Sequence, residues 1–143
     1  MKMIRAGLIA GLILVNLSGC GSDEAPPRTT ARTSFETSPY GERVFEDYRK
    51  TGTISQEVTL PKGSREVAVN MDCAGSQGRL KVDFATAGGA GIACTPKRTG
   101  RGGLVVLGGD GSLLDRRQTI TITGPSDQQW SVAIDAGAKV TSN

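Results

Sequence analysis

The side chains with the widest chemical repertoire in this 143-residue chain are three cysteines, Cys20, Cys73 and Cys94. The sequence contains no histidine, which removes the most common general base and the most common metal-binding side chain. A serine or cysteine nucleophile needs a neighbouring base, and no serine–lysine motif supplies one. Cys73 and Cys94 also lack the CxxC spacing of a zinc site. We therefore expect no enzymatic activity, no metal ion and no cofactor.

Glycine-rich stretches and aspartates offer two further kinds of site. Residues 100–103 and 108–111 are rich in glycine, but no helical pattern follows either, as a phosphate-binding loop requires. Asp110 and Asp115 could contribute to a calcium loop, although the further carboxylates of such a loop are missing. No pair of carboxylates is indicated at one cleft, as glycoside hydrolysis needs. These stretches are predicted to be turns.

The N-terminus has the pattern of an export signal. Lys2 and Arg5 give it a positive start, and residues 6–15 form an apolar run without a charge. A helix of ten residues reaches only about 15 Å, half the thickness of a bilayer core. The run is therefore interpreted as the core of a signal peptide rather than as a transmembrane helix.

The four residues that follow, Leu17-Ser18-Gly19-Cys20, closely resemble the lipobox of bacterial prolipoproteins. This resemblance implies a signal peptide over residues 1–19 and a diacylglyceryl group on Cys20. Two acyl chains would anchor the protein stably to the outer face of the plasma membrane. In a bacterium with two membranes, Gly21 after the cysteine would permit sorting to the outer membrane. The rest of the chain resembles small actinobacterial envelope lipoproteins only loosely, which implies no activity.

Residues 20–50 are expected to form the lipidated N-terminus and a flexible linker. Residues 21–40 are rich in Pro, Ser, Thr and charge, a composition that buries too little apolar surface to become ordered. As a flexible chain of about 20 residues, this segment would hold the domain roughly 25 Å from the bilayer. In residues 41–50, the spacing of Val44, Phe45 and Tyr48 suits either a short helix or more linker.

From residue 51 to residue 143, apolar and polar side chains alternate with the period of two that is typical of half-buried strands. About seven short strands are indicated, separated by turns rich in Gly, Pro, Ser and Asp. We expect an all-β fold, a small antiparallel β-sandwich. The alternative is a small β-barrel.

Cys73 and Cys94 are predicted to form a disulfide bond. Export would place them in an oxidising compartment, where an even number of cysteines favours pairing. Both cysteines also fall on the inward-facing positions of their strands, in step with Met71 and Ile92. Cys20 has no such partner, so it remains free for lipid.

Trp130 and a basic loop are the remaining candidates for binding. An exposed tryptophan could stack on a sugar, but Trp130 shares its alternation with Val132 and Ile134, which favours a place in the core. Lys97, Arg98 and Arg101 could meet anionic lipid or wall polymer, or could be an ordinary solvated loop.

The charge of the chain argues against a nucleic-acid partner. Without Lys2 and Arg5, 15 basic and 14 acidic side chains remain, a net charge of +1, which lacks the basic excess of nucleic-acid-binding domains. The expected function is that of a membrane-anchored extracytoplasmic lipoprotein with a non-catalytic binding domain for a cell-envelope protein or glycan. The alternative is an accessory subunit of a larger envelope complex. An exposed edge at the strand of Thr119, Thr121 and Thr123 would favour this alternative.

Overall fold

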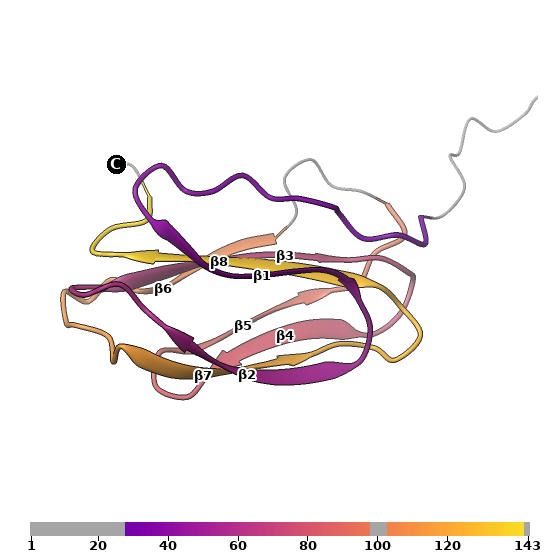
Figure 1. Cartoon of the computed structure of the whole chain (residues 1–143). Helices are drawn as coiled ribbons and strands as arrows, with labels where there is room; N and C mark the ends of the chain where they lie inside the picture. The colour runs from indigo at the N-terminus through magenta and orange to yellow at the C-terminus, as the bar shows by residue number, and fades with distance from the viewer. Residues whose placement is uncertain (1–27, 98–102, 142–143) are drawn as a thin grey trace, which may run out of the picture.

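The computed structural model describes residues 28–97 and 103–141, which fold into two packed antiparallel β-sheets. The strand order in the first sheet is β1-β8-β3-β6, and in the second it is β2-β7-β4-β5. Figure 1 shows the first sheet as the upper layer and the second as the lower one. The strands are β1 (Glu42–Lys50), β2 (Thr53–Thr59), β3 (Glu66–Cys73), β4 (Arg79–Phe84), β5 (Gly88–Ala93), β6 (Gly103–Gly108), β7 (Arg117–Thr123) and β8 (Trp130–Gly137).

The strand pairing follows a simple rule. The first strand pairs with the last, the second with the seventh, the third with the sixth and the fourth with the fifth. The chain therefore forms one long antiparallel ribbon, which folds over so that β3 also pairs with β8 and β4 with β7. Eight strands connected in this way form a jelly roll.

The predicted β-sandwich is confirmed, and the alternative of a small barrel is wrong. Within the described residues, the strands at the ends of each sheet pair on one side only: β1 and β6 in one sheet, and β2 and β5 in the other. The sheets pack face to face through the alternating apolar side chains that the sequence indicated, because alternation gives each sheet one apolar face. The seven expected strands correspond to β2 through β8.

The eighth strand, β1, corrects the prediction for residues 41–50. This segment is neither a short helix nor linker but a strand that pairs with β8, and it buries Phe45 opposite Ile134. Its register shifts twice, between Arg43 and Phe45 and between Asp47 and Lys50. Such irregularities break the period of two by which a strand is recognised in a sequence. The domain therefore begins before residue 51.

Trp130 lies fully buried in the core, as its alternation predicted, and its interpretation as a sugar-stacking platform is wrong. Its indole N–H donates a hydrogen bond of 3.0 Å to the backbone oxygen of Gly52, so the polar edge of the ring is satisfied. The indole also packs on Gly124, where a Cβ atom would come within 2.3 Å of the ring. A glycine is required at that position.

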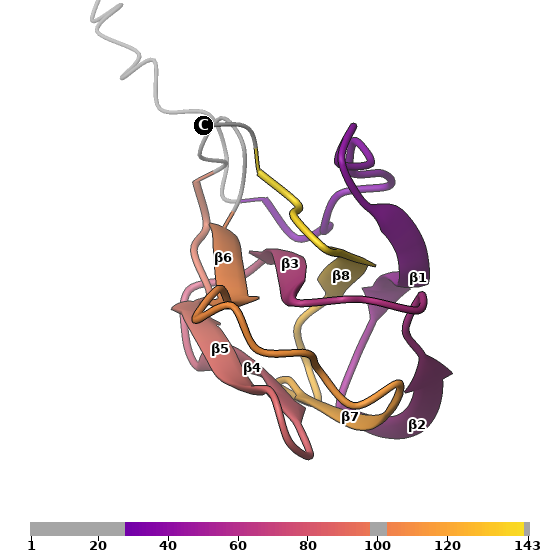
Figure 2. The ribbon, with the colours of Figure 1, turned by 90° about the vertical axis from the view of Figure 1, so that its left-hand side faces the viewer.

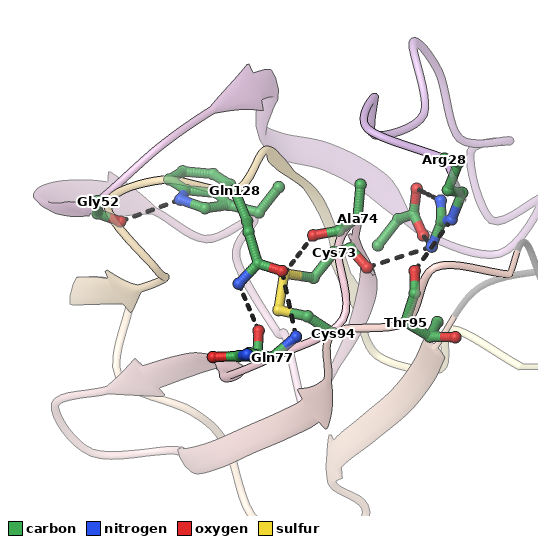
Figure 3. The surroundings of a disulfide bond; sticks show 10 residues. Arg28, Gly52, Cys73, Ala74, Gln77, Cys94, Thr95 and Gln128 are labelled. Carbon is green, nitrogen blue, oxygen red and sulfur yellow. Dashed lines mark hydrogen bonds and ion pairs between the residues drawn. A yellow bond between two sulfur atoms is a disulfide. The ribbon is translucent and has the colours of Figure 1, made fainter. Parts of the chain in front are cut away.

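The predicted disulfide between Cys73 and Cys94 is present and links the two sheets. Cys73 ends β3 in one sheet, whereas Cys94 directly follows β5 in the other. The backbone N–H of Thr95 donates to the oxygen of Cys73 at 3.1 Å, which holds the two segments together beside the bond. Figure 3 shows these residues, with the Gln128 amide hydrogen-bonded to the backbone of Gln77 nearby.

Removing the disulfide should destabilise the domain substantially. The bond joins residues 21 positions apart, and closing a loop of this length contributes about 3 kcal/mol on the chain-entropy model. We expect the double variant Cys73→Ala/Cys94→Ala to lose about 3 kcal/mol of free energy of unfolding, measured by urea denaturation. An unchanged unfolding midpoint would show that the sheets hold together without the bond.

Candidate functional site

The most elaborate polar arrangement in the described residues lies on the outer face of the β1-β8-β3-β6 sheet. Two aspartates of this face are buried although they point away from the core: Asp72 of β3 is 4% exposed and Asp135 of β8 is fully buried. They are covered by residues 28–40, which we call the strap. Figures 1 and 2 show the strap in indigo, running across the outer side of this sheet. Buried carboxylates require partners, and the strap supplies them.

Arg28 holds the start of the strap against Asp72. Its guanidinium donates two hydrogen bonds of 2.7 Å, one to each oxygen of the carboxylate. The same guanidinium donates to the backbone oxygens of Cys73 at 3.2 Å and Thr95 at 3.3 Å, beside the disulfide (Figure 3). A two-pronged arginine–carboxylate pair is the strongest and most directional ion pair that proteins form.

Asp72 remains ionised in this setting. Burial alone would raise the pKa of its carboxyl group, but hydrogen bonds from Arg28 and from the backbone N–H of Arg32 outweigh burial and lower that pKa below its ordinary value. The carboxylate therefore contributes stability only while it is deprotonated.

Asp135 fastens the other end of the strap. One of its oxygens accepts a hydrogen bond of 2.6 Å from Nε of Arg43 in β1, and the other accepts 2.9 Å from the backbone N–H of Ser38. Arg43 also donates to the backbone oxygens of Phe35 and Glu36. Desolvation lowers the pKa of Arg43, but its bonds to Asp135 and Glu46 prevail and raise it.

The middle of the strap is tied down by Ser131, which is fully buried on β8. Its hydroxyl donates to the backbone oxygen of Arg32 at 2.6 Å and accepts from the backbone N–H of Arg49 at 3.0 Å. The ring of Phe35 also stacks on Tyr48 of β1, with centroids 6.0 Å apart. The prediction of a flexible spacer over residues 21–40 is therefore wrong from Arg28 onwards. Composition could not reveal the strap, because polar contacts rather than apolar burial hold it.

A groove of about 720 Å³ opens along the strap. Its floor is formed by Ala68 and Asn70 of β3 and Leu104 of β6, and its walls by strap residues and by Val140 and Thr141 near the C-terminus. Leu104 is 54% exposed. The Asn70 side chain is only partly buried and makes no hydrogen bond within the described part of the chain. Its amide can offer both a donor and an acceptor to a ligand.

A second, smaller hollow of about 230 Å³ lies at the other candidate site, between Thr86, Asp110 and Asp115. Asp110 and Asp115, which the sequence suggested as parts of a calcium loop but favoured as turn residues, both line this hollow. However, no group of three or more acidic, cysteine or histidine side chains that could hold a metal occurs within residues 28–97 and 103–141. The Asp110 carboxylate accepts hydrogen bonds from Ser112, which lower its pKa. This arrangement is that of a turn.

The other residues that the sequence singled out do not form a site. Lys97 is exposed, while Cys20, the signal peptide over 1–19, Arg98 and Arg101 lie outside the described residues. Thr119, Thr121 and Thr123 belong to β7, which pairs on both sides with β2 and β4. The expectation that this strand could be an exposed edge is therefore wrong.

Comparison of the chain with protein-family models, with curated proteins and with solved structures found no match. None of the described residues belongs to a helix long and apolar enough to span a bilayer.

Replacing Asp72 should loosen the strap in a manner that depends on pH. We expect Asp72→Asn to lose about 2 kcal/mol of free energy of unfolding at pH 7, because a charge-assisted pair is broken. The stability difference between wild type and variant should have its full size above about pH 4, which is the pKa of an aspartate in an unfolded chain. It should shrink as the pH falls through the lower folded pKa, where the wild-type carboxylate also becomes neutral. Urea denaturation at several pH values measures it.

Asp83→Asn is the matched control, because the Asp83 side chain is 49% exposed on the outer face of the other sheet and, among the described residues, forms an ion pair only with Lys81 at 3.7 Å. It should change stability by less than about 0.5 kcal/mol. Equal losses in the two variants would argue against a special role for Asp72.

Proposed function

We propose that this chain is a membrane-anchored extracytoplasmic lipoprotein whose jelly-roll domain is a non-catalytic binding module. The observation that carries the proposal is the Cys73–Cys94 disulfide, which is buried and joins the two sheets. Structural disulfides are characteristic of proteins that fold outside the reducing cytoplasm. The bond also accounts for two of the three cysteines, which leaves Cys20, in the lipobox-like sequence, available for lipid.

The strap supports a close attachment to the bilayer. Only eight residue steps separate Cys20 from Arg28, which is fastened to Asp72 of the domain. A chain of eight residues spans at most about 28 Å even when fully extended. With lipid on Cys20, the domain would stay near the headgroups and could not sweep far from them.

The contacts of the strap also favour binding over catalysis. Asp72 and Asp135, the buried carboxylates of this face, are both paired with arginines, so neither is a free general base. The groove instead combines the Asn70 amide, which makes no hydrogen bond within residues 28–97 and 103–141, with hydroxyls such as those of Ser34 and Thr37 and with the apolar Leu104. Such a mixture suits a ligand that has both hydroxyl groups and apolar faces, and an envelope glycan has this chemistry.

Lipidation is tested by the variant Cys20→Ser in a bacterium that processes lipoproteins. The wild-type chain should incorporate tritiated palmitate and sediment with membranes. Cys20→Ser should lose the label, because serine cannot form the thioether, and should appear as unprocessed or soluble protein. Ser22→Ala, just outside the four-residue motif, is the control and should behave as wild type. Retention of label by Cys20→Ser would disprove lipidation at this residue.

Binding in the groove is tested by the variant Asn70→Ala. If an envelope glycan binds there, loss of the amide should weaken retention on immobilised cell-wall glycan about tenfold, the effect of one good hydrogen bond. Thr121→Ala, on the outer face of the opposite sheet, should leave retention unchanged. If the wild-type protein itself is not retained, a glycan is the wrong ligand, and an envelope protein becomes the partner to seek.

A further inference from the structure

The four edge strands of the sandwich differ sharply in how they are protected. Exposed edges usually carry charges, bulges or irregularities that prevent pairing with another chain. Six of the nine residues of β1 are charged, and its register shifts twice. Exposed Glu57 lies among polar side chains in β2, and three of the six residues of β5 are glycines.

The fourth edge, β6, has none of these protections. Its sequence is Gly-Leu-Val-Val-Leu-Gly, without a charge or a proline, and it pairs with β3 in uninterrupted register. Its other side pairs with no strand of the described chain. Figure 2 shows β6 at one side of the molecule, at the edge of its sheet and above β5 of the other sheet.

Exposed apolar side chains gather on this same strand. Leu104 is 54% exposed and Val106 is 37% exposed, and they are two of only four large apolar side chains exposed in residues 28–97 and 103–141. Their partners across the ladder, Asn70 and Ala68, point to the outer face of the sheet. An unpaired edge and an apolar stripe beside it are the two features of a surface for strand addition.

We propose that β6 is the surface through which two copies of this chain pair, edge to edge, about a two-fold axis. Strand β6 is suited to its own copy because it is apolar along its whole length and carries no charge that a second copy would repel. A symmetric antiparallel pairing with Val105 on the axis sets Leu104 of each copy opposite Val106 of the other. The four side chains then cover one another on one face, and no like charges meet.

The symmetry also agrees with attachment to one membrane, a point that depends on the proposed lipidation. A two-fold axis perpendicular to the joined sheet keeps the outer faces of both copies on the same side. The strap begins on that face, where Arg28 binds Asp72. Both lipid anchors would therefore reach the same bilayer, where confinement raises the effective concentration of the partners.

The test is the mass of the full-length protein, purified in detergent and measured by light scattering after gel filtration, with the detergent subtracted. The wild-type protein should form dimers once its concentration is raised to about 100 µM, a concentration that suffices for weak specific pairing. Val106→Lys and Leu104→Lys should remain monomeric, because each places like charges together at the two-fold axis. Both positions are solvent-exposed, so the fold should survive, which an intact Cys73–Cys94 bond would verify.

Thr119→Lys is the matched control, because Thr119 is exposed on β7 in the interior of the other sheet, and it should still dimerise. Disulfide crosslinking tests the register separately. A mixture of the Leu104→Cys and Val106→Cys variants should form crosslinked dimers more readily than either variant alone, because Leu104 lies opposite Val106 of the other copy, whereas the two copies of the same residue lie diagonally apart. A monomeric wild-type protein, dimers of both lysine variants, or a complex with a different protein would each overturn the proposal. None of these outcomes bears on lipidation at Cys20.

Discussion

The last two residues of β3 fasten three layers of this molecule together. Successive side chains of a strand point to opposite faces, so Asp72 faces outward and Cys73 faces the core. Asp72 binds Arg28 and holds the strap, while Cys73 is bonded to Cys94 of the opposite sheet. Arg28 also donates to the backbone oxygen of Cys73. Strap, first sheet and second sheet therefore depend on one short piece of backbone.

The features that the sequence predicted are those that a local pattern records. Alternation in β3, β4, β7 and β8 revealed which face of each strand points to the core between the sheets, and the same parity paired Cys73 with Cys94 and assigned Trp130 to the core. Strand β1 was not predicted because its register shifts remove the alternation of apolar and polar side chains. The strap was not predicted because Arg28 and Asp72 lie 44 residues apart, and no local sequence pattern records a contact over that separation.

The polar fastening of the strap has a physical consequence for the outer face. Replacing a buried ion pair by apolar residues often costs nothing in stability, whereas removing one partner is costly. The main effect of Asp72 and Asp135 is therefore to fix the position of the strap rather than to add net stability. Their directional hydrogen bonds hold the strap in one place on the sheet. An apolar strap could slide, but one held by Arg28 at one end and Ser38 at the other cannot. The groove beside it keeps a defined wall for that reason.

The groove and the edge of β6 share a residue. Leu104 lies in the floor of the groove and also belongs to β6, whose outer edge pairs with no strand of the described residues. A strand added at β6 would extend the floor on which a ligand rests, and in a symmetric pair two such floors would adjoin. Ligand binding and pairing, as proposed, would thus be coupled through one side chain. By thermodynamic linkage, if ligand binding favours pairing, pairing must favour ligand binding by the same free energy.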